Sequence, residues 1–183
     1  MIYHLSLQTA GVFAGVFLLL VSLPGLIMPE SSRNFARRLP RSRVAGFLIL
    51  TVDLFWSVWL LATMEMGEFS GFRRPLLFLV PIGFFLVLRF VDEFLAVRAL
   101  GIFLLLAAEP LLDAAFFRIE PSRLLVTVLA YLLIVIGLFW VTMPYLLRDQ
   151  INWTGRTLGR WRLTHGVALL YGATILGFAM TRY

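Results

Sequence analysis

The sequence contains no cysteine and no lysine, and only two of its 183 residues are histidine. Without cysteine, the chain cannot form a disulfide, a thiolate metal site, a cysteine nucleophile or a cysteine-anchored haem or lipid. No phosphate-binding loop and no HExxH, GxSxG or GxGxxG motif is present. Because the acids are also scattered, we predict no metal site and no catalytic residue.

Charge is scarce as well. Charged residues make up 14% of the chain, hydrophobic residues make up 61%, and the mean hydropathy is +0.92. Soluble domains are about half apolar and about a quarter charged. A soluble fold of this size could not hide so much apolar surface. We therefore predict an all-α integral membrane protein, with residues 1–183 forming a single membrane domain.

Six apolar segments approach the length of about 20 residues that crosses a bilayer. They cover about residues 6–28, 44–64, 75–91, 94–117, 124–143 and 163–180. The third segment is uninterrupted only from Pro75 to Leu88, about 21 Å at the helical rise per residue. The alternative to six membrane-spanning helices is therefore four spans plus a re-entrant helical hairpin at 75–108.

The distribution of arginine predicts the orientation. Eleven of the sixteen arginines fall on the side of the membrane that holds loops 29–43 and 144–162, and five fall on the other side. Because basic loops stay in the cytoplasm, we place both termini outside, in the bacterial cytoplasmic membrane. The formal charge of +6 lies in short loops, so it indicates membrane topology and no nucleic-acid partner.

The two basic loops are predicted to lie at the membrane interface and to bind phospholipids. In the first loop, Ser31 or Ser32 is expected to cap a short helix. In the second, Ile151, Leu158 and Trp161 would share one face of a surface helix. The expected head-group contacts are Arg33, Arg37, Arg38, Arg41, Arg43, Arg156, Arg160 and Arg162. The expected interfacial anchors are Trp140, Tyr145, Trp153 and Trp161.

Ionisable residues at membrane depth are the first place to look for function, because a charge is costly there. Asp53 lies about 14 Å into the second segment. Arg98, which enters the fourth segment from the same side, is its expected partner. The alternatives are a proton or ion relay and a polar contact with another subunit. Glu109 and Asp113 share a helical face with Arg98. The two acids form either a solvated helix end or an acidic vestibule for cations.

Small residues spaced four apart predict faces where helices pack closely. These positions are Gly11, Gly15, Ala168, Gly172, Ala173 and Gly177. They serve packing within the monomer or association with another subunit. His4 and His165 fall on opposite sides of the predicted membrane, so they cannot bind one haem together. A haem or pigment held by either histidine alone is the only cofactor alternative.

Three functions fit these features. The leading hypothesis is a non-enzymatic subunit that scaffolds a larger membrane assembly, with other membrane proteins as partners. The second is a small transporter or channel that uses Asp53 and Arg98. The third is an interfacial enzyme that acts on lipids, with its arginines holding phosphate head groups.

Overall fold

The structure is a computed structural model that describes all residues except 1–2, 4, 91–93, 119 and 183. Six helices in it are long and apolar enough to cross a membrane. They are α1 (Leu7–Ile27), α3 (Arg43–Thr63), α4 (Arg73–Phe90), α5 (Leu95–Ala115), α6 (Arg123–Thr142) and α8 (Leu158–Thr181). The predicted all-α polytopic bundle with six spans is confirmed.

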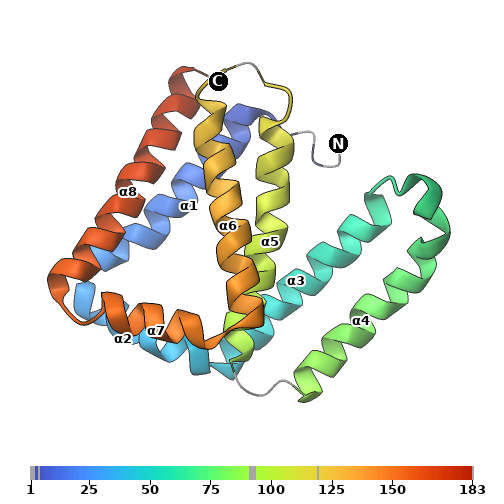
Figure 1. Ribbon diagram of the computed structural model, residues 1–183, viewed down its shortest axis with the longest axis horizontal. Helices are drawn as coiled ribbons and strands as arrows, with labels where there is room; N and C mark the ends of the chain where they lie inside the picture. Colours follow the sequence, from blue (N-terminus) through green and yellow to red (C-terminus); the bar gives the residue numbers. More distant parts are fainter. Residues whose placement is uncertain (1–2, 4, 91–93, 119, 183) are drawn as a thin grey trace.

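Two short amphipathic helices, α2 (Pro29–Arg38) and α7 (Tyr145–Thr154), lie across one end of the spans (Figure 1). A 3₁₀ turn, η1 (Leu39–Arg41), leads from α2 into α3. The start of α1 and the end of α8 lie at the opposite end (Figure 1). The arginine-rich segments therefore share one side, and the positive-inside rule makes that side cytoplasmic.

The re-entrant alternative for 75–108 is not supported. The helix α5 has 21 residues, so it spans about 31 Å. The helix α4 has 18 residues and continues directly from a second 3₁₀ segment, η2 (Gly67–Phe72). It begins two residues before Pro75, since proline is compatible with the first helical turn. Both helices are long enough to cross.

The spans form a fan of pairs rather than a closed ring (Figure 1). The helix α1 packs along α8, α5 packs along α6, and α3 leans against α5. At one edge of the fan, α4 packs mainly against α3 and has no buried residue. The helix α4 therefore leaves a large part of its apolar surface exposed, while Phe84, Val87 and Leu88 pack against α3 and α5.

Glycines allow the paired helices to approach closely. A Cβ atom added at Gly101 of α5 would lie 2.8 Å from the carbonyl oxygen of Gly137 on α6. One added at Gly172 of α8 would lie 2.7 Å from Cβ of Leu18 and 3.1 Å from the carbonyl oxygen of Gly15 on α1. Close backbone contact is a main source of attraction between helices in lipid.

Two local predictions in the basic loops are wrong. The helix α2 begins at Pro29, so Ser31 and Ser32 lie inside it rather than capping it. The second loop does not contain one surface helix, because α7 ends at Thr154 and α8 begins at Leu158. The side chain of Thr157 accepts a hydrogen bond from the backbone N–H of Arg160 at 3.3 Å and so starts a new helix.

Candidate functional site

Asp53 is the buried acid of the membrane interior. It lies on the face of α3 that carries Gly46 and Leu50, and it is 2% exposed. Neither carboxylate oxygen has a hydrogen-bond partner in the described part of the chain. The predicted pair with Arg98 is not formed, and Nε of Arg98 also lacks a partner there.

The register of two parallel helices explains this correction. Both α3 and α5 run outward from the cytoplasmic end (Figure 1), and Gly46 lies directly against Ala96. Arg98 therefore lies level with about residue 48 of α3. Asp53 is five residues further along, which is about 7.5 Å along the helix axis.

Replacing Asp53 with leucine should raise the free energy of unfolding by about 1–3 kcal/mol, because leucine has the same branched shape and no polar atom to leave unsatisfied. Unfolding in mixed detergent micelles measures this change. The control is Asp149→Leu, which removes an exposed acid paired with Arg148 and should change stability by less than about 1 kcal/mol. A loss of stability in Asp53→Leu would show that the carboxyl has a stabilising partner.

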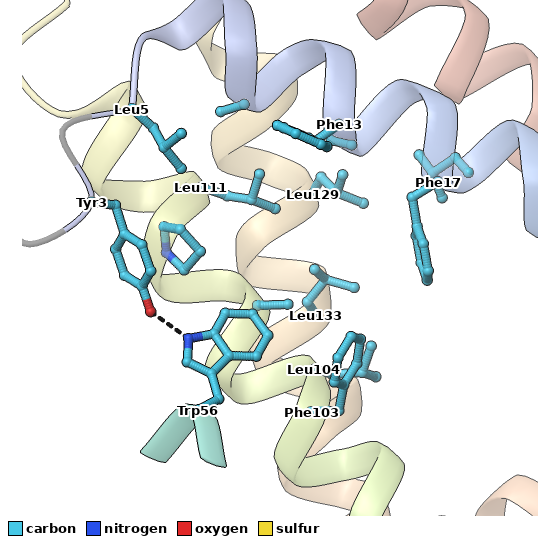
Figure 2. A pocket seen from close by; sticks show the side chains of 15 residues that line it. Tyr3, Leu5, Phe13, Phe17, Trp56, Phe103, Leu104, Leu111, Leu129 and Leu133 are labelled. Atoms are coloured by element: carbon cyan, nitrogen blue, oxygen red, sulfur yellow. Dashed lines mark hydrogen bonds between the residues drawn. The ribbon is translucent and has the colours of Figure 1, made fainter. Parts of the chain in front are cut away.

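A cavity of about 300 Å³ lies in the outer half of the fan between α1, α3, α5 and α6. Its lining is apolar, with Phe13, Leu111 and Leu129 among the side chains that surround it in Figure 2. At its edge, Nε1 of Trp56 donates a hydrogen bond to Oη of Tyr3 at 2.6 Å. The cavity can accommodate hydrocarbon, and it offers no polar partners for water.

The outer acids lie beyond this cavity. Burial raises the pKa of the Tyr3 hydroxyl to about 12, and the nearby carboxylates of Glu109 and Asp113 add to the increase. The lining extends from Trp56, one turn beyond Asp53, to Pro110, which follows Glu109. The four predicted pathway residues are therefore not brought together, since apolar side chains separate Asp53 and Arg98 from the two outer acids.

The predicted small-residue faces divide into two groups. Gly11 and Gly15 of α1 and Gly172 of α8 are buried where these helices cross, and Ala168 is half-buried. By contrast, Ala173 is exposed. A Cβ added at Gly177 would meet nothing within 4 Å. The helix α8 thus has one small-residue face toward α1 and another toward the surroundings.

The predicted head-group arginines are exposed except Arg33, which is half-buried. Among the predicted anchors, Trp153 is exposed under the guanidinium of Arg160, and Nε1 of Trp140 donates to Oε1 of Gln150 at 3.2 Å. Tyr145 is also exposed. Trp161 is 4% exposed and packs against the ring of His165, so its prediction as an interfacial anchor is wrong.

His165 occupies a tight position between α8 and α1. Its Nδ1 atom lies 2.9 Å from the carbonyl oxygen of Trp161, and its ring covers Gly25. The side of the His165 ring that faces α1 is therefore covered by protein. His4 lies outside the described residues. In the part of the chain that the structure describes, no group of three histidines or acids could hold a metal ion.

Comparison with known proteins relates the C-terminal part of the chain to a family. A family model described as "Cell division protein CrgA" matches residues 113–183, which run from the end of α5 through α6, α7 and α8. No curated protein and no solved structure matches the chain. The protein is integral to the bacterial cytoplasmic membrane, and its last two spans are similar to a family of cell division membrane proteins.

Proposed function

We propose that this protein is a non-enzymatic subunit that binds and stabilises other membrane proteins of the cell division machinery. The observation that carries this proposal is the match of residues 113–183 to the cell division family. The matched segment comprises two spans and the interfacial helix between them, so the similarity involves membrane-embedded surface. A partner that contacts this segment would do so mainly within the bilayer.

The face proposed to receive the partner is the outward face of α8, made of Ala173 and Gly177 with Leu170 and Met180 beside them. Leu170 and Met180 are 67% and 71% exposed, and nothing lies within 4 Å of a Cβ built at Gly177. Small residues flanked by large apolar ones allow another transmembrane helix to approach closely. The occupant we propose is a transmembrane helix of a division protein.

The described geometry offers less support for the two alternatives. A polar path from Asp53 to the outer acids would have to pass the apolar cavity edged by Trp56 and Phe103. A lipid-modifying enzyme would need two acids converging on one point. Glu109 and Asp113 do share the outer end of α5, but the tyrosine beside them faces an apolar cavity rather than the arginine-rich side.

The experiment is a gentle extraction of the tagged chain at its natural level, with native mass measurement and imaging of a fluorescent fusion in dividing cells. The proposal predicts a particle heavier than the 20.8 kDa chain, division proteins in that particle, and fluorescence concentrated at the division site. A matched fusion to an unrelated polytopic membrane protein controls for crowding at the septum. A lone monomer spread evenly over the membrane would contradict the proposal.

A further inference from the structure

A second pocket, of about 200 Å³, lies at the cytoplasmic end of the molecule. Its walls come from α2, η1, the start of α5 and α7, which are distant in sequence. The lining residues are Arg37, Pro40, Arg41, Phe94, Arg148, Ile151 and Asn152. Three guanidinium groups from three different elements therefore surround one small space, and Asn152 and three apolar side chains complete it.

Little in the described part of the chain neutralises these arginines. One Nη atom of Arg37 donates a single long hydrogen bond, 3.4 Å, to the carbonyl oxygen of Gly155. Arg148 pairs through Nε with its neighbour Asp149, and both side chains are about half exposed. For Arg41, the described residues supply no hydrogen bond or ion pair. Among the residues that the structure describes, most of the N–H donors of these three side chains therefore have no partner.

The position of the pocket indicates the class of anion. The helices α2 and α7 lie across the ends of the spans (Figure 1), at the level where phospholipid head groups lie in a bilayer. One guanidinium group of arginine can bind two oxygens of a phosphate at once. Basic pockets on the cytoplasmic side of membrane proteins bind anionic head groups. The apolar groups of Pro40, Phe94 and Ile151 suit the start of an acyl chain or glycerol backbone.

We propose that this pocket binds a phosphate group, supplied by an anionic phospholipid head group or by a soluble phosphate. The arginines of three elements would hold that phosphate together and so tie α2 to α7. Arg148 is the member that sequence reasoning missed, because it lies apart from the other arginines of its loop and its neighbour is an acid. This inference is independent of the proposed role in cell division.

The test uses the whole protein in nanodiscs of phosphatidylcholine that contain a minor fraction of phosphatidylglycerol, with retained lipids counted by native mass spectrometry. The wild type should retain phosphatidylglycerol. The triple variant Arg37→Gln, Arg41→Gln, Arg148→Gln should bind it about tenfold to a hundredfold more weakly. The matched control removes three exposed arginines that lie outside the two basic loops, with Arg74→Gln, Arg118→Gln and Arg182→Gln, and should retain the lipid as the wild type does.

A second arm distinguishes the sources of phosphate. Competition by inorganic phosphate at millimolar concentration would assign the pocket to a soluble anion, whereas retention of the lipid would assign it to the head group. The single variant Arg148→Gln, at an exposed position, keeps the test valid should the triple variant not fold, and it should weaken retention severalfold. Equal retention in the wild type and in the pocket variants, or an equal loss in the control triple, would overturn the proposal.

Discussion

The variant Gly172→Val should lose roughly 3 kcal/mol of unfolding free energy, because its side chain has no space against α1. A Cβ at this position would lie 2.7 Å from Cβ of Leu18, an atom that cannot move without the helix backbone. The helices α1 and α8 would have to separate, and the contact between Gly15 and Gly172 would be lost. Unfolding in mixed detergent micelles measures the loss.

The control for this prediction is on the same helix. Gly177→Val introduces the same side chain five residues later, where nothing lies within 4 Å of the new Cβ. It should change the unfolding free energy by no more than about 0.5 kcal/mol. Equal effects of the two substitutions would mean that the α1–α8 crossing is not where the structure places it.

The six spans could be predicted from sequence because the requirement is local. A segment of about 20 apolar residues satisfies its own backbone hydrogen bonds as a helix and needs no knowledge of its neighbours. The arginine count then oriented the bundle. The same reasoning predicted that the last helix begins at about residue 163, whereas α8 begins at Leu158. The first turns of α8 are polar, so their hydropathy resembles that of a loop.

The candidate sites were harder to predict because they depend on how helices pair. The ion pair of Asp53 and Arg98 required a register between α3 and α5 that only the contact of Gly46 with Ala96 reveals. The approach of Gly101 to Gly137 joins two helices whose glycines do not follow a four-residue spacing within either helix. Hydropathy also gives no sign that α4 is left unburied at the edge of the fan.

The basic pocket shows the same limit. Arginines were predicted as a diffuse surface that binds head groups, one loop at a time. The folding of α2 against α7 selects Arg37 and Arg41 from one loop and Arg148 from the other. No linear pattern links the two loops, since Arg148 lies more than 100 residues from both Arg37 and Arg41 in the chain.

The double variant Ala173→Ile, Gly177→Ile should remove the partner while leaving the fold intact. Both positions are exposed on α8 within the segment that matches the cell division family. Isoleucine would hold a docking helix away from the backbone, and an overpacking cost of about 1.4 kcal/mol or more weakens association about tenfold or more. The matched control is Gly83→Ile on α4, which also has nothing within 4 Å of its Cβ but lies outside the matched segment.

The most direct measurement is therefore the amount of division protein recovered per molecule of tagged chain after gentle extraction, compared between the wild type, the double variant on α8 and Gly83→Ile. The account predicts that recovery falls about tenfold or more for the α8 variant alone, with all three proteins equally abundant and equally stable. Undiminished recovery with the α8 variant, or a loss with Gly83→Ile instead, would contradict the assignment of the partner to this face.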